Sequence, residues 1–255
     1  MFKGTSASAG IGIGKAVIVE EAELVITRNE VADAEAEIQR FKGALEKTIA
    51  ATQKMADDLA SRVGEKEAEI MQGHMMLLSD PMLTGEIENS VKNDKVNSEF
   101  AIENVCNMYA DMFASMGDEL MQQRATDMRD IKVRMQRTLM GLESVDVSLL
   151  PKGSILVAKD LTPSMTAGIN PENVSGIVTE LGGKTSHSAI LARALEIPAV
   201  VAVNGLMDAV KDGDKVVLDG STGEVFVDPE ASVEKEYEEK RKQFLKDKKE
   251  LEKYI

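Results

Sequence analysis

The residues best suited to chemistry lie in a short segment rich in glycine and hydroxyl side chains, residues 181–193, which reads LGGKTSHSAILAR. Its histidine, His187, follows two glycines and two hydroxyl residues and precedes a run with helical spacing. Glycines let an anion approach backbone amides closely, and a helix start presents N–H groups with positive dipole character. A neutral imidazole can attack phosphorus and later release it. The segment therefore indicates phosphoryl transfer through His187, although a histidine at a helix start can also serve only as a cap or a packing residue.

Other site chemistries fit the sequence poorly. The chain has two histidines, His74 and His187, and one cysteine, Cys106, so neither a zinc site nor a disulfide framework is expected. The run GIGIGK at residues 10–15 has glycines in a GxGxG spacing, which differs from the dinucleotide-binding fingerprint. It also lacks the first glycine and the final Ser or Thr of a phosphate-binding P-loop. We interpret it as a turn between two strands, and we expect no metal site.

An α/β domain has to position the histidine segment. Short β-branched runs separated by Gly, Asp and Asn turns predict strands after Pro151, and a helix is expected over about Ser188–Leu195. The predicted strands are Ser154–Ala158, Gly176–Thr179, Ala199–Val203, Lys215–Leu218 and Glu224–Val227. Residues 2–20 also read as strands, and we expect them to pair with these C-terminal strands because the intervening chain offers no strand partners.

The intervening chain is predicted to be helical. Between about residues 29 and 142 apolar side chains recur every three or four positions, as in Ile38, Phe41, Leu45 and Ile49. The sequence thus predicts an α/β domain, residues 1–22 plus 145–229, that carries an inserted all-α helical bundle at residues 23–144. Residues 230–255 form a charged helical connector, whose one thin apolar seam consists of Tyr237, Phe244 and Leu251 spaced by seven.

Composition excludes some partners. The formal net charge is −14, whereas binding of nucleic acid needs a basic surface. No run approaches the roughly 18 apolar residues of a membrane span, and the first residues lack the apolar core of a signal peptide. With a single cysteine, the chain fits a reducing compartment, and we expect it in the cytoplasm.

Several segments resemble one family. The run GGKTSHSAILARALEIPAVV, residues 182–201, resembles the phosphohistidine signature shared by enzyme I of the bacterial phosphotransferase system, pyruvate phosphate dikinase and phosphoenolpyruvate synthase. Four further segments resemble enzyme I itself: GTSASAGIGIGKAV near the N-terminus, GHMMLL at residues 73–78, RATDMRDI at 124–131 and LTPSMTAGI at 161–169. The resemblance covers essentially the whole chain and implies a swivelling phosphohistidine domain with a helical insertion.

The resemblance implies roles for individual residues. His187 would accept the phosphoryl group, and Thr166 would hold its imidazole. Gly183, Thr185 and Ser186 would surround the group, while Arg193 would either neutralise its charge or cap a turn. The helical domain would dock the phosphocarrier protein HPr through Glu65, His74, Met76, Leu77, Leu83 and Arg124. Two positions depart from the family: Lys184 stands where arginine is common, and Glu67 stands where a docking lysine is expected, with Lys66 beside it.

The resemblance also implies what lies elsewhere. In the family, phosphoenolpyruvate and Mg²⁺ bind a C-terminal (β/α)₈ barrel that also forms dimers, and nothing in this sequence resembles it. We therefore expect a monomeric N-terminal fragment that exchanges phosphoryl groups with HPr only and needs no cofactor. Two alternatives are open: the swivelling domain of a dikinase or synthase, which would not dock HPr, and a non-catalytic binding module, in which His187→Ala would change nothing.

Overall fold

The computed structural model describes residues 1–254 and divides the chain into two compact units. The first, here called the α/β unit, comprises Met1–Glu20 and the chain from Val145 onward. The second, the helical unit, is the continuous segment Glu21–Ser144 between them. The predicted domain boundaries, after residues 22 and 144, lie within two residues of these divisions. The helical unit is thus an insertion in a discontinuous α/β unit, and the predicted fold class is confirmed.

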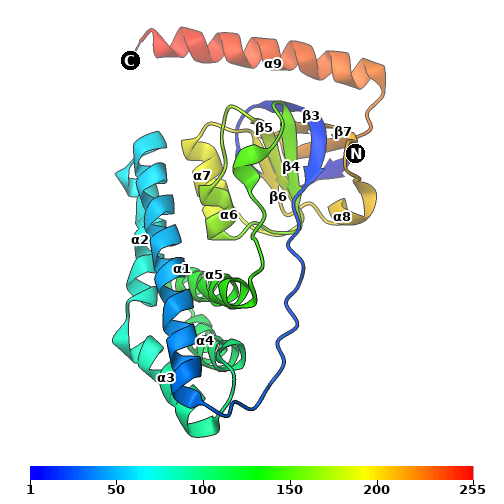
Figure 1. Ribbon diagram of the computed structural model, residues 1–255. Helices are drawn as coiled ribbons and strands as arrows, with labels where there is room; N and C mark the ends of the chain where they lie inside the picture. Colours follow the sequence, from blue (N-terminus) through cyan, green and yellow to red (C-terminus); the bar gives the residue numbers. More distant parts are fainter. Residues whose placement is uncertain (255) are drawn as a thin grey trace. The chain divides into compact units, whose positions relative to one another are not determined.

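Within residues 1–254, the strands of the α/β unit form one sheet, of which Figure 1 labels β3 to β7. Its eight strands lie in the order β1-β8-β7-β3-β4-β5-β6-β2. The strands are β1 (Phe2–Lys3), β2 (Thr5–Ser8), β3 (Ile11–Ile18), β4 (Ser154–Ala158), β5 (Val174–Thr179), β6 (Ala199–Val201), β7 (Lys215–Asp219) and β8 (Glu224–Val227). Strands β3, β4, β5 and β6 run parallel, and β7 pairs with β3 in the antiparallel direction. The N-terminal strands do pair with C-terminal ones, since β1 joins β8 and β2 joins β6.

The glycine run near the N-terminus is not a turn, and this interpretation of residues 10–15 was wrong. Gly12 and Gly14 lie inside strand β3, and of the run only Gly10 precedes it, with φ of +124°. A Cβ atom on Gly12 would lie 2.8 Å from the carbonyl oxygen of Ser175, and one on Gly14 would lie 2.0 Å from that of Gly153. These glycines are required because neighbouring backbone lies too close for any side chain.

Helices cover both faces of the sheet. Alternation along the strands sends Leu156 and Ile177 to one face and Ile155 and Val178 to the other. Helices α6 (Pro163–Ala167) and α7 (His187–Ala194) supply side chains to the first core, and α8 (Leu206–Ala209) to the second. A short 3₁₀ turn, Val147–Leu149, precedes β4. The carboxyl ends of β4 and β5 therefore lead into the two helices on the same face.

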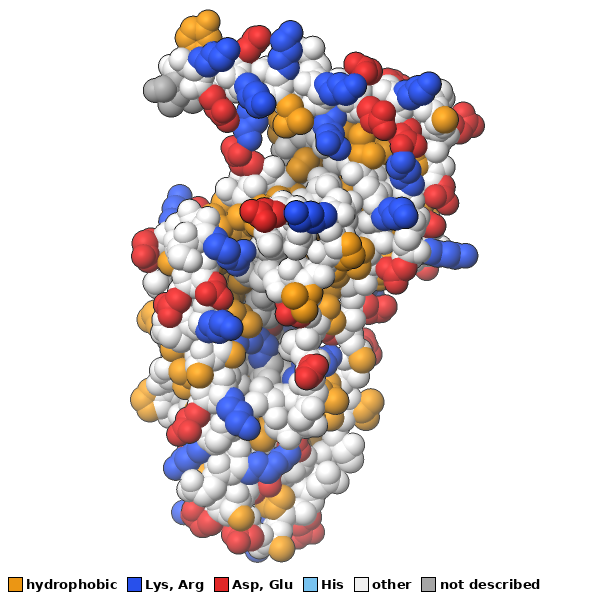
Figure 2. Space-filling view, turned by 45° about the horizontal axis from the view of Figure 1, so that its top comes forward, with side chains coloured by type: hydrophobic (Ala, Val, Ile, Leu, Met, Phe, Trp, Pro, Cys, Tyr) orange, Lys and Arg blue, Asp and Glu red, His pale blue; other side chains and the backbone are white. Residues whose placement is uncertain are grey.

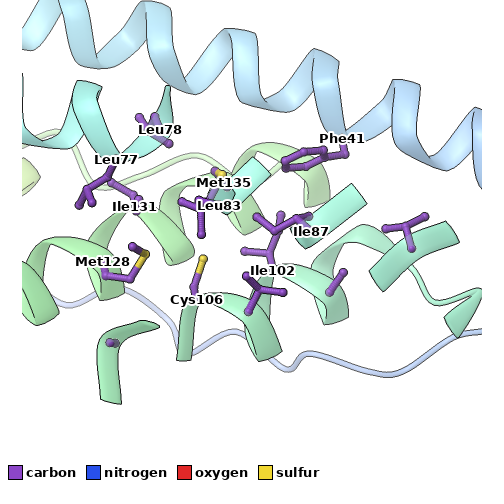
Figure 3. Packing of buried hydrophobic residues seen from close by; sticks show 14 of the residues in the cluster. Phe41, Leu77, Leu78, Leu83, Ile87, Ile102, Cys106, Met128, Ile131 and Met135 are labelled. Atoms are coloured by element: carbon purple, nitrogen blue, oxygen red, sulfur yellow. The ribbon is translucent and has the colours of Figure 1, made fainter. Parts of the chain in front are cut away.

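The helical unit is a bundle of α1 (Ala34–Arg62), α2 (Glu65–Leu78), α3 (Pro81–Asp94), α4 (Ser98–Ser115) and α5 (Glu119–Met140). Side-chain caps set several helix starts: Asp33 accepts from the amide of Ala36, and Asp118 from that of Met121. The apolar faces meet in one core (Figure 3), whose labelled members include Phe41, Leu83, Ile87, Ile102, Met128 and Met135.

Helix α9 (Ala231–Glu252) belongs to the α/β unit and uses its apolar seam only in part. Tyr237 is buried, packs on the ring of Phe226 at a centroid distance of 5.1 Å, and donates its hydroxyl hydrogen to Glu224 at 2.7 Å. Leu251, at the other end of the seam, is 67% exposed. Across the residues that the structure describes, no helix has the length and apolarity to cross a membrane.

Candidate functional site

His187 is the first residue of α7, and the loop before it is closed by its own hydrogen bonds. Ser186 caps the helix, because its Oγ accepts from the amide of Ala189 at 3.3 Å. The same hydroxyl donates to the carbonyl of Gly183 at 2.7 Å and lies 3.1 Å from the hydroxyl of Ser188. The loop conformation is therefore held by the chain itself, so His187 begins the helix from a fixed backbone position.

Gly182 and Gly183 of this loop are glycines for different physical reasons. Gly182 has φ of +103°, a backbone conformation that residues with a side chain rarely adopt. At Gly183, a Cβ atom would meet no atom of the described residues within 4 Å. Open space beside Gly183 and the exposed side chains of Lys184 and Thr185 leave this part of the loop accessible to an anion.

The loop is also fixed from behind by the sheet. Thr179, the last residue of β5, donates its hydroxyl hydrogen to the carbonyl of Leu181 at 2.6 Å. The amide of Leu181 donates to the carbonyl of Lys159, just beyond β4, at 2.9 Å. The loop thus starts at the carboxyl edge of the parallel strands, which is where open α/β sheets place their ligand sites.

Arg193 secures the far side of the loop. Its guanidinium donates to the carbonyl of Ala7 in β2 at 2.9 Å and to the carbonyl of Lys184 at 2.9 Å. Of the two roles predicted for Arg193, the structure therefore favours the structural one. Both terminal nitrogens are already used to tie this loop to β2, and a planar guanidinium suits such a double contact.

Thr166 lies on α6, which packs beside α7, and its side chain is buried. Its hydroxyl donates to the carbonyl of Thr162 at 2.8 Å, a bond within the helix. Because that hydrogen is used, the Thr166 oxygen can interact with a further group only as an acceptor. An acceptor suits the N–H of an imidazole, so the geometry is compatible with the predicted orienting role.

A carboxyl group that the sequence did not single out stands close to the same edge. Asp160 follows β4 and Lys159, and partial desolvation raises the pKa of its carboxyl although the residue lies at the surface. Nothing in the local sequence marks this residue, because its environment depends on the folded edge of the sheet. No three His, Cys, Asp or Glu side chains gather into a possible metal site anywhere in residues 1–254.

The predicted docking residues of the helical unit separate into two groups. Glu65 and Met76 of α2 are exposed, Met76 by 68%, and Arg124 of α5 is partly exposed. His74, Leu77 and Leu83 are buried in the helical unit, with exposures of 0, 8 and 2%. Because these three side chains are covered in the chain alone, they offer a partner little contact area, and direct contact between them and a partner stays a prediction.

The period of α2 explains this separation. Met71, His74 and Leu78 recur at three and four residues and face the interior, where His74 Nε2 lies 2.9 Å from Asp127 Oδ1 of α5. The opposite face carries Glu65 and Met76 together with two exposed residues that the sequence analysis missed, Glu69 and Gln72. Their spacing of four, three and four residues is helical and was available in the sequence.

Comparison with known proteins agrees with this architecture. The model of the N-terminal domain of phosphoenolpyruvate-utilising enzymes matches residues 3–124, and that of their mobile domain matches residues 150–223. A solution structure of Enzyme I is 39% identical, covers 96% of this chain and 99% of its own, and superposes with a TM-score of 0.82. The chain belongs to the phosphoenolpyruvate-utilising enzyme family. The resemblance predicted from the histidine segment is thereby confirmed.

Full-length relatives of this family are longer. The phosphoenolpyruvate-protein phosphotransferase of Bacillus subtilis is 41% identical over 100% of this chain but only 45% of its own length. The Staphylococcus carnosus protein of the same name is 41% identical over 99% of this chain and 44% of its own length. A structure titled N-terminal domain of Enzyme 1 - Nitrogen is more distant, with 26% identity and a TM-score of 0.60. The chain thus spans less than half of these curated phosphotransferases.

Proposed function

We propose that this chain carries a phosphoryl group on His187 and exchanges it with the phosphocarrier HPr. The observation that carries the proposal is the position of His187, at the first residue of α7 behind a glycine loop that is closed by Ser186 and anchored by Arg193. Relatives at about 40% identity are named phosphoenolpyruvate-protein phosphotransferase, and that name supports phosphoryl transfer to a protein.

The transfer step needs few protein groups. A ring nitrogen of neutral His187 attacks the phosphorus of phosphorylated HPr, a new N–P bond forms, and the N–P bond to the carrier histidine breaks. The Thr166 oxygen, whose own hydrogen is donated to the carbonyl of Thr162, would accept a hydrogen bond from the N–H of the other ring nitrogen and so hold the imidazole in one orientation. Lys184, exposed in the loop, supplies positive charge beside the transferred group.

HPr would dock on the accessible part of the helical unit. Glu65, Glu69 and Met76 on one face of α2 present two carboxylates and a thioether, and Arg124 adds a partly exposed cation. Figure 2 shows acidic, basic and apolar side chains interspersed on the surface. An apolar contact with acidic neighbours suits a partner that carries positive charge around its own active histidine.

Other features are proposed for the longer relatives. Phosphoenolpyruvate as the original donor, Mg²⁺ as its cofactor and dimer formation are proposed for the portion of the relatives beyond the length matched here. We propose that the reaction takes place in the cytoplasm, where a single unpaired cysteine, Cys106, is compatible with the reducing conditions.

The experiment mixes the chain with phosphorylated HPr, and separately with phosphoenolpyruvate and Mg²⁺, and follows intact mass. We expect one phosphoryl group from phosphorylated HPr and none from phosphoenolpyruvate. Because the chain has only two histidines, His187→Ala and His74→Gln form a matched pair. Acceptance should vanish in the first and persist in the second. Persistence in His187→Ala would refute the proposed acceptor.

A further inference from the structure

The helical unit holds two chemically different kinds of sulfur. Cys106 is buried in the core, and burial raises the pKa of its thiol to about 12. The reactive thiolate is therefore scarce and covered. The thioethers are different, because five methionines in α2, in α3, and in α4 and its C-cap expose between 45 and 69% of their surface. We name these five the methionine surface: Met76, Met82, Met108, Met112 and Met116.

The members of the methionine surface lie on three consecutive helices. Met76 belongs to the last turn of α2, and Met82 to the first turn of α3. Met108 and Met112 lie in α4, and Met116 is its C-cap residue; because the three recur every fourth residue, they share one helix face. Tyr109 of α4 donates its hydroxyl hydrogen to Glu86 of α3 at 3.1 Å, which fixes these two helices side by side.

Exposed and covered methionines occur in the same unit, so the fold itself selects among them. Met71, Met128 and Met135 are at most 1% exposed and lie in the interior. An oxidant dissolved in water reaches the methionine surface but not these three. A thioether also needs no ionisation before it reacts, unlike a thiol, so its reactivity does not depend on a depressed pKa.

We propose that the methionine surface is a reversible oxidation site that regulates docking of HPr. A hydroperoxide transfers its terminal oxygen to the thioether sulfur, the O–O bond breaks, and the products are a sulfoxide and water or an alcohol. The sulfur is oxidised, the peroxide is reduced, and no net proton is released. The regulatory part rests on the proposed docking role of Met76, whereas the modification site rests on exposure alone.

Oxidation of a thioether to a sulfoxide makes the methionine surface more polar. It replaces a flexible apolar contact with a polar group, and burying that group under a partner without a hydrogen bond is unfavourable. Affinity for HPr is therefore expected to fall about tenfold or more when Met76 and its neighbours are oxidised. The fold is retained, because the oxidised side chains already face water. A methionine sulfoxide reductase restores the thioether and with it the affinity.

The test treats the whole chain with hydrogen peroxide and maps the added oxygen atoms by peptide mass spectrometry. HPr affinity is measured by titration calorimetry before treatment, after treatment, and after incubation with methionine sulfoxide reductases. In a variant with all five positions changed to leucine, HPr affinity is measured before and after peroxide treatment. The two affinities should be equal. Met140→Leu is the matched control, since Met140 is also exposed, by 40%, but lies at the end of α5 remote from Arg124. This control should remain sensitive.

The outcomes separate the two proposals. Oxygen found on Met71, Met128 or Met135 as readily as on the methionine surface would overturn the selective site. Unchanged affinity after full oxidation of the methionine surface would overturn the regulation. If the untreated chain does not bind HPr, the proposed function and its regulation both fail, while the peptide map still decides whether the modification site exists. Loss of affinity in the five-leucine variant on treatment would show that another residue is responsible.

Discussion

Replacing His74 tests whether this histidine acts through contact with a partner or through the fold. The imidazole is fully buried between α2 and α5, with Nε2 2.9 Å from Asp127 Oδ1. His74→Ala removes the ring and its bond to the carboxylate. The opposite face of the same helix carries Met76, which is 68% exposed. Two residues only two positions apart should therefore respond to substitution in different ways.

The magnitude follows from these contacts. A buried hydrogen bond to a charged group contributes about 2 kcal/mol, and the loss of packed side-chain atoms adds roughly 1–2 kcal/mol. His74→Ala is thus expected to lower the free energy of unfolding by about 3–4 kcal/mol. At roughly 2–4 °C per kcal/mol for a domain of this size, Tm falls by about 10 °C. Met76→Ala, in contrast, should alter stability by less than about 0.5 kcal/mol.

Two measurements on each variant distinguish the roles. Thermal unfolding is followed by circular dichroism, and HPr affinity is measured below the lower of the two transitions. We expect His74→Ala to be destabilised but to retain most of its affinity, and Met76→Ala to be stable but weakened in binding. The reasoning is refuted if His74→Ala keeps its Tm and loses HPr binding, because His74 would then be a contact residue. His74→Gln, which keeps a donor, should lie between the alanine variant and the native protein in stability.

Other substitutions examine the loop, the glycines and the response to acid. Gly14→Ala should lower the free energy of unfolding by more than about 3 kcal/mol, because its Cβ would lie 2.0 Å from a backbone oxygen. Gly43→Ala, whose Cβ meets open space within α1, should raise that free energy by about 0.5–1 kcal/mol, and denaturant titrations measure both changes. Arg193→Lys removes the planar guanidinium that joins the carbonyl of Lys184 to that of Ala7 in β2. The rate of phosphoryl transfer from phosphorylated HPr should therefore fall about tenfold at unchanged Tm, and an unaltered rate would contradict the anchoring role. Burial opposes ionisation of Glu37, but hydrogen bonds from Ser98 and Arg40 outweigh it and lower the pKa of this carboxyl below its ordinary 4.5. Ionised Glu37 therefore stabilises the fold fully above pH 4.5, and this stabilisation is lost as the pH falls through the lowered pKa of the folded state. Below about pH 4.5, the Tm of Glu37→Gln should therefore depend less on pH than the Tm of the native protein.

The sequence predicted the elements well where local pattern decides them. Ser154–Ala158 and Glu224–Val227 form strands with the predicted bounds, because each is a β-branched run between turn residues. The glycines of β3 were misinterpreted for a physical reason. A glycine permits a turn, but it equally permits close approach of another backbone, and the approaching residues, Ser175 and Gly153, are far away in the sequence.

The candidate site was predictable to a smaller extent. Its centre follows from local order, since glycines, hydroxyls, His187 and a helix lie within a dozen residues. The contacts that support the site cannot be predicted in this way. Arg193 donates a hydrogen bond to Ala7, 186 residues away, and no sequence periodicity indicates that contact. The burial of His74, in contrast, could have been predicted from the sequence. The spacing of Met71, His74 and Leu78 already marked an inward face, and the segment's family resemblance outweighed that signal.

The loop contacts bear on the role proposed for His187. The carbonyls of Gly183 and Lys184 accept hydrogen bonds from Ser186 and Arg193, and Leu181 at the start of the loop is bonded to Lys159, just beyond β4, and to Thr179 of β5. Every one of these bonds lies inside the α/β unit, so the helix start that presents His187 is retained in whatever position the unit takes. A site built in this way needs no partner to complete it. Under the proposed function, docking of HPr depends on a separate surface, so substitutions on the face of α2 are expected to change HPr affinity without changing phosphoryl acceptance at His187.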